Sequence, residues 1–159
     1  MDLRIHHHTE VELVAEAGPL FLRILNGAVT TNTCVDRLLK QLDDMLERWP
    51  IVAIIVVVEH GTPHATPEIR RRVDTDLRRY GDRIVVGYAL LGLGFWGVDA
   101  KQFGAERAAE LATEVYVESS LVALAGRLAF DLVGVDPGVI VSTCEQLRAE
   151  LGLGASEGP

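Results

Sequence analysis

The residues best suited to chemistry lie in one short loop, where Glu59, His60 and His64 follow the apolar run Ile51–Val58. A carboxylate beside two imidazoles could move protons near neutral pH or bind a metal ion. Ligands of open α/β sheets often bind at the carboxyl ends of central strands, where this loop would lie. The spacing matches no standard zinc-ligand pattern, so we expect solvent-exposed loop residues and no metal site. An enzyme that uses the Glu59–His64 loop is one alternative for the function.

A second candidate is the segment Gly92–Gly97, whose glycines have the spacing of a dinucleotide-binding loop. Bulky Phe95 and Trp96 stand where the backbone should approach a pyrophosphate, and no acidic residue follows at the end of a next strand. We therefore expect no nucleotide and no other cofactor. If they are exposed, the two aromatic side chains are candidate anchors for a protein partner or for self-association into a homo-oligomer.

Arginines form the basic cluster of the sequence, at positions 70–72 and 78–79. Successive residues of a helix point about 100° apart, so the first three arginines do not form one patch. We expect salt bridges from this cluster to Asp74 and Asp76. Docking to an acidic partner is the alternative.

The composition excludes several classes of function. The 159 residues carry a net charge of −8, which argues against binding to nucleic acid or to anionic lipid. Cys34 and Cys144 are far apart, as expected for two reduced thiols of a cytosolic protein. The longest purely apolar run is Ile51–Val58, which is too short to insert into a membrane. We expect a cytoplasmic protein without a nucleophilic catalytic set.

The elements that must position these residues follow from hydrophobic periodicity. Residues Glu10–Leu13 alternate between polar and apolar, which predicts a mostly half-buried strand that continues through Glu16. Leu20–Leu25 is expected to form the second strand of an antiparallel hairpin. Thr33 with Asp36 resembles a capping box at the start of an amphipathic helix that ends before Pro50. The run Ile51–Val58 reads as a strand buried on both faces.

The second half alternates helix and strand in the same way. Thr66 can cap a helix that begins at Pro67, and Ile84–Leu91 is the next buried strand. The pattern from 98 to 133 is helical, with a break near 113–117 where β-branched residues gather. A short strand at 139–141 and a helix from Thr143 through Leu151 complete the chain. Residues 1–9 and 152–159 are expected to be flexible ends of one domain over 10–151.

The order β-β-α-β-α-β-α-β-α predicts an α/β fold with a mixed, mostly parallel sheet covered by helices. It is similar to the STAS fold of anti-sigma-factor antagonists, and the chain resembles small bacterial SpoIIAA-like, or STAS/SEC14-like, proteins. The resemblance covers about residues 10–151. It rests on the following segments: Leu25-Asn26-Gly27, Trp49-Pro50 before Ile51–Val58, the proline-containing loop before Arg70, Gly92-Leu93-Gly94-Phe95, and Val139–Val141 leading into a short helix.

The resemblance implies a noncatalytic regulatory module that acts through protein–protein contacts. Antagonists of the family are phosphorylated near the start of the helix after the central strand, so Thr62 and Thr66 are the candidate phosphorylation sites. This region lacks the family's usual Asp-x-Ser pattern. Thr62, His64 and Thr66, with Phe95 and Trp96, are the residues expected to contact a partner. The SEC14-like name implies an alternative function, the binding of an apolar small molecule or lipid between the sheet and its helices.

Overall fold

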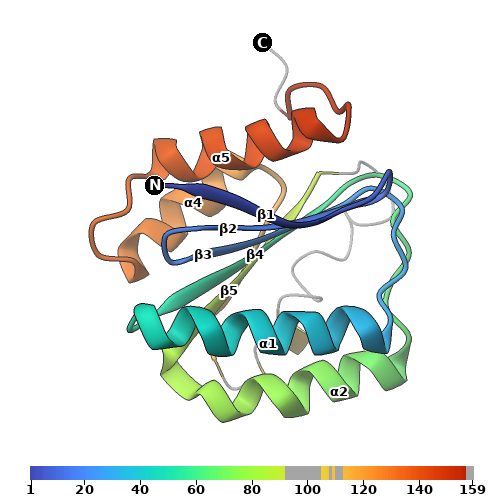
Figure 1. Ribbon diagram of the computed structural model, residues 1–159, viewed down its shortest axis with the longest axis vertical. Coiled ribbons are helices and arrows are strands. Elements are labelled where there is room, and N and C mark those ends of the chain that lie inside the picture. Colours follow the sequence, from blue (N-terminus) through green and yellow to red (C-terminus); the bar gives the residue numbers. More distant parts are fainter. Residues whose placement is uncertain (92–104, 108, 110–112, 157–159) are drawn as a thin grey trace.

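The computed structural model describes residues 1–91, 105–107, 109 and 113–156, and shows one sheet with helices on both faces (Figure 1). The strands and helices are β1 (Leu3–His8), β2 (Glu12–Ala17), β3 (Leu20–Leu25), α1 (Asn32–Arg48), β4 (Val52–Val58), α2 (Pro67–Leu77), the 3-10 helix η1 (Arg78–Arg83), β5 (Ile84–Leu90), β6 (Val115–Glu118), α4 (Leu121–Asp131) and α5 (Pro137–Glu150).

The sheet has six strands in the order of the sequence. β1, β2 and β3 pair antiparallel, whereas β3, β4, β5 and β6 pair parallel. The turn between β2 and β3 uses Gly18 at a φ of 53°, a conformation that glycine adopts without strain. The predicted hairpin and the α/β class with a mixed, mostly parallel sheet are thus confirmed.

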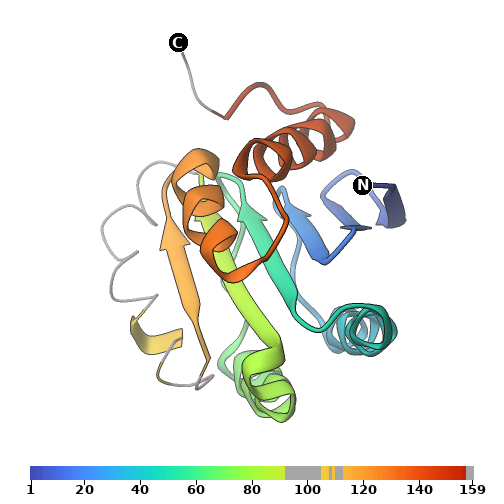
Figure 2. The ribbon, with the colours of Figure 1, turned by 90° about the vertical axis from the view of Figure 1, so that its left-hand side faces the viewer.

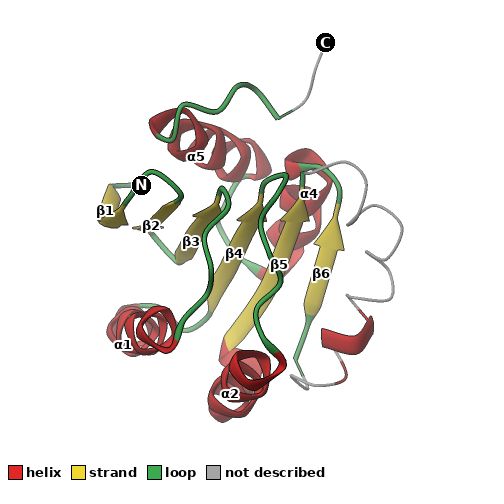
Figure 3. Cartoon of the chain, turned by 90° about the vertical axis from the view of Figure 1, so that its right-hand side faces the viewer, coloured by secondary structure: helices red, strands yellow, loops and turns green. Residues whose placement is uncertain are grey.

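Two layers of helices bury the two faces of the sheet. α1 and α2 cover one face, and α4 and α5 cover the other (Figures 2 and 3). Successive β4 residues alternate between the layers: Ile54 packs with α1 residues such as Leu42, and Ile55 packs with Leu124 and Leu128 of α4. β4 is therefore buried on both faces, as its continuous apolar sequence predicted.

Helix capping explains where the helices of the first face begin. The side chain of Thr66 accepts a hydrogen bond from the backbone of Ile69 at 3.3 Å, and Pro67 is the first residue of α2, as expected. α1 is capped by Thr31 rather than by Thr33, so the helix begins two residues earlier than predicted. Arg48 is the last residue of α1, just before Trp49 and Pro50.

Three expectations for the ends of the fold are corrected. Residues 3–8 form strand β1 instead of a flexible end, and His6 and His7 reach the buried carboxylates of Glu16 and Glu12 at 3.3 and 3.4 Å. Residues 115–118 form strand β6 instead of helix, because their β-branched residues pair with β5. The described part of the tail is held where Ser156 donates a hydrogen bond to Glu145.

The predicted strand at 139–141 is also wrong, because these residues belong to α5. Asp136 accepts a hydrogen bond from Gly138 at 2.7 Å, so Asp136 caps the helix and Pro137 is its first residue. Residues 140, 144 and 147 are buried at helical spacing, and this pattern outweighs the β-branched residues at the start. None of the described helices is long and apolar enough to cross a membrane.

A buried ion pair ties the end of β4 to α5. Arg148 donates hydrogen bonds to the two carboxylate oxygens of Glu59 at 3.2 and 2.5 Å, and both residues are buried. The same guanidinium also donates to Glu145 at 2.8 Å and to the carbonyl of Gly154 at 2.6 Å. Arg148 thereby joins the sheet, α5 and the segment that follows α5.

Removing one partner of this pair should destabilise the protein more than removing both. Arg148→Met leaves the Glu59 carboxylate buried without its cation, so we expect the free energy of unfolding to fall by about 3–5 kcal/mol. The double variant with Glu59→Met and Arg148→Met should lose less than the single variant, because no buried charge is left unpaired. Urea denaturation of the three proteins measures this. A double variant less stable than Arg148→Met would contradict the prediction.

Gly87 tests how closely α4 packs on β5. A methyl group at Gly87 would lie 2.8 Å from Cδ1 of Leu124 and 3.3 Å from Cδ1 of Leu128. We expect Gly87→Ala to lower the free energy of unfolding by about 1–3 kcal/mol, the usual range for overpacking a core. Gly126→Ala is the matched control: no neighbouring atom lies within 4 Å, so helix propensity should raise stability by about 0.5–1 kcal/mol. Thermal and urea unfolding of both variants provide the comparison.

Candidate functional site

A cavity of about 130 Å³ lies between the sheet and the helices α1 and α2. Its floor is formed by rows of side chains that parallel pairing aligns across β3, β4 and β5. One row is Phe21, Ile54 and Val86, and every member is apolar and buried. Leu38 of α1 and Val73 of α2 also line the cavity, so most of its surface is apolar.

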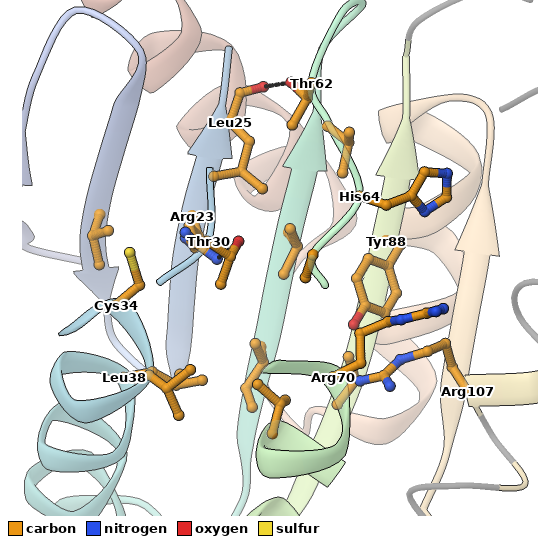
Figure 4. Close-up of a pocket in the computed structure, with 18 of the residues that line it drawn as sticks. Arg23, Leu25, Thr30, Cys34, Leu38, Thr62, His64, Arg70, Tyr88 and Arg107 are labelled. Carbon is orange, nitrogen blue, oxygen red and sulfur yellow. Dashed lines mark hydrogen bonds between the residues drawn. The ribbon is translucent and has the colours of Figure 1, made fainter. Parts of the chain in front are cut away.

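The next row of the floor introduces polar groups. It consists of Arg23, Val56 and Tyr88, which are register partners on the same three strands. The third row, Leu25, Val58 and Leu90, is apolar again. An arginine and a tyrosine therefore project from an otherwise apolar floor, on the side of the sheet that faces α1 and α2 (Figure 4).

Two arginines of the cavity share one carboxylate. Arg23 donates from Nε to Glu12 at 2.7 Å and from a terminal nitrogen to the hydroxyl of Thr30 at 3.1 Å. A terminal nitrogen of Arg37, on α1, lies 3.6 Å from the other carboxylate oxygen of Glu12. Glu12 is buried, so its negative charge is held between these cations. One carboxylate does not neutralise two guanidinium groups.

Arg70 and Arg107 lie at the opposite wall, next to the ring of Tyr88 (Figure 4). Arg107 forms an ion pair with Asp74, and both side chains are buried. Arg70 differs, because its Nε is buried and has no hydrogen-bond acceptor among the described residues. Among the described residues, no carboxylate forms an ion pair with Arg70.

His64 lies at the rim, above Tyr88 in Figure 4. Partial burial and the nearby positive charge of Arg70 lower the pKa of His64 below its ordinary value. Protonation of the imidazole is therefore disfavoured. The field of Arg70 reaches the mouth of the cavity and disfavours further positive charge there.

The structure separates the predicted contact residues Thr62, His64 and Thr66. His64 and Thr66 are exposed, and the hydroxyl of Thr66 caps α2. Thr62 is buried: its hydroxyl donates to the carbonyl of Leu25 at 3.0 Å and accepts from the backbone of Gly27 at 2.9 Å. A phosphate on Thr62 would remove the hydroxyl proton that is donated to Leu25, and the buried hydroxyl would first have to become accessible to a kinase. Its placement therefore suits a structural role better than phosphorylation or surface contact.

The Glu59–His64 loop does not bring its candidate catalytic groups together. Glu59 faces Arg148 on the α5 side of the sheet, His60 is exposed, and His64 lines the cavity on the α2 side. No group of three metal-ligating side chains is found among the described residues. Phe95, Trp96 and the Gly92–Gly97 segment lie outside the described residues.

Sequence reasoning missed the residues that give the cavity its polar character. We expected the arginine cluster to pair with Asp74 and Asp76; Arg72 does reach Asp76 at 3.5 Å, but Arg70 faces the cavity. A signal was present in Arg23, the single charged residue of the buried strand Leu20–Leu25. Charged residues are seldom buried without a partner, so such a position points to a polar site.

Comparisons with protein-family models, with curated proteins and with solved structures found no match. The function must therefore be argued from the cavity and its residues.

Proposed function

We propose that this protein is a noncatalytic binder of a small, largely apolar molecule, which occupies the cavity between the sheet and the helices α1 and α2. The observation that carries the proposal is the cavity itself. Its floor and walls are mainly apolar side chains, with a few polar groups that converge on it, as is usual for ligand sites. The position agrees with the ligand site that the SEC14-like resemblance implies.

The volume limits the size of the ligand. An apolar cavity of about 150 Å³ engineered into another protein is known to bind benzene. The cavity of about 130 Å³ therefore suits a single ring or a short chain rather than the whole acyl chain of a membrane lipid. We expect a ligand core of about the size of benzene.

The described residues favour binding over catalysis. Two carboxylates beside the cavity, Glu12 and Asp74, form ion pairs with arginines, which fix their orientation. A general base needs a carboxylate or imidazole that can accept a proton at the reacting atom. His64 is the imidazole at the rim, and partial burial together with the positive charge of Arg70 disfavours its protonation by lowering its pKa.

A protein-contact module of the STAS type receives less support from the described residues. Of the five predicted contact residues, Phe95 and Trp96 lie outside the described part of the chain, and Thr62 is buried. His64 and Thr66 are exposed, but they flank a cavity rather than an apolar contact surface. We therefore place ligand binding first and regulation through a protein partner second.

The two cysteines allow the proposal to be tested. Cys34 lines the cavity, whereas Cys144 is buried on the other face, where burial raises its pKa to about 12. N-ethylmaleimide should therefore modify Cys34 and spare Cys144 in the folded protein, because the thiolate is the reactive form. Neutral probes with an apolar ring, such as benzene and benzamide, should slow the modification of Cys34. Intact-protein mass spectrometry follows the modification.

Two variants provide the control. Val56→Phe fills the cavity floor and should remove the protection, whereas Val122→Phe places the same ring on the exposed side of α4 and should retain it. Native mass spectrometry of the purified protein should in addition reveal a retained small molecule. Unchanged Cys34 reactivity with every probe, together with no retained ligand, would refute the proposed function.

A further inference from the structure

We infer that the occupant of the cavity is a small amphipathic anion, whose apolar part lies on the β3–β5 floor and whose oxyanion, a carboxylate or a phosphate monoester, is bound by Arg70. The inference rests on the proposed function and names the class of ligand. It follows from the charges around the cavity, which are positive in a protein whose net charge is −8.

Arg70 carries the first part of the argument. Its Nε is buried and has no acceptor within the described structure, and a buried charged donor without a partner destabilises the folded protein. The neighbouring Arg107 has Asp74 as its partner, so the same wall contains one neutralised and one unneutralised guanidinium. An oxyanion from a ligand would supply the missing acceptor, and the planar guanidinium can bind it with two hydrogen bonds.

The wall of the cavity that contains Arg23 and Arg37 carries the second part of the argument. Arg23 and Arg37 share the single carboxylate of Glu12, so this wall also retains positive charge. Glu16 of β2 and Asp36 of α1 do not offset this charge, because Glu16 is paired with Arg48 at 3.0 Å and Asp36 is paired with Arg72. Two walls with excess positive charge face one space of about 130 Å³. A neutral ligand would leave both walls uncompensated, whereas an anion would be attracted by both.

The apolar floor carries the third part. Phe21, Ile54 and Val86 form a continuous buried row beneath the arginines. A free inorganic anion would make no favourable contact with these apolar side chains, and it would lose part of its hydration on entering the cavity. A molecule with an apolar ring or short chain and one acidic group satisfies both parts of the site.

Isosteric pairs of ligands separate the anion from the apolar body. Calorimetric titration of the full chain with benzoate and benzamide, and with hexanoate and hexanamide, compares a carboxylate with a neutral amide of the same shape. Hexyl phosphate distinguishes a phosphate monoester from a carboxylate as the preferred head group. We expect each anion to bind at least tenfold more tightly than its amide, and the preference to weaken as the salt concentration rises.

Substitution of Arg70 assigns that preference to one residue. Arg70→Gln should remove the preference for the anion over the amide, and Arg70→Lys should retain part of it. Arg71→Gln is the matched control, because the adjacent Arg71 is exposed on α2 and does not line the cavity. Thermal unfolding of each variant checks that it is folded. As an independent readout, NMR titration should show the pKa of His64 rising when benzoate, but not benzamide, is bound.

The possible outcomes are distinguishable. An anion preference that disappears in Arg70→Gln and persists in Arg71→Gln supports the inference. Equal binding of anions and amides overturns the inference but leaves the proposed apolar binding intact. An anion preference unaffected by Arg70→Gln also overturns it. If neither anions nor amides bind, both the inference and the proposed function are wrong.

Discussion

The structure depends on the parallel pairing of β4 with β3 on one side and β5 on the other. Because the pairing is in register, side chains from the three strands line up in rows, and alternate rows face opposite helix layers. One set of rows forms the core under α4 and α5, and the other forms the cavity floor under α1 and α2. The placement of Arg23 beside Val56 and Tyr88 is a direct result of this register.

The central elements were predictable from the sequence because their signals are local. Pro67 after Thr66 marks the start of α2, and the unbroken apolar run before Glu59 marks β4. The elements that were predicted wrongly lack such local signals or carry conflicting ones. β6 exists because four residues pair with β5, and α5 replaces a β-branched strand because Ile140 repeats with Cys144 and Leu147 at helical spacing. β1 was missed because its three consecutive histidines are polar and suggested a flexible chain end.

The site was less predictable than the fold, since it is made by contacts between residues distant in sequence. Arg70 belongs to an arginine cluster in which Arg72 and Arg79 form surface ion pairs, and only the folded chain shows that the Nε of Arg70 is buried. The net charge of the whole chain also did not predict the charge around the cavity. A chain with a charge of −8 nevertheless places Arg23, Arg37 and Arg70 around one cavity, where partial burial makes their field stronger than on the surface.

The buried hydroxyl of Thr62 has a consequence for how the cavity can open. Its two hydrogen bonds, to Leu25 and Gly27, join the segment after β4 to the segment after β3. These segments lead into α2 and α1, which form the opposite sides of the cavity. The starts of α1 and α2 are therefore connected through Thr62 at one end of the sheet. The far ends of the two helices are connected as well, because Arg83 after α2 donates a hydrogen bond to the carbonyl of Leu46 in α1 at 2.7 Å and the hydroxyl of Tyr80 donates to Asp43 at 2.7 Å. The two sides of the cavity are therefore fixed to each other at both ends, and a wider cavity would require at least one of these contacts to break.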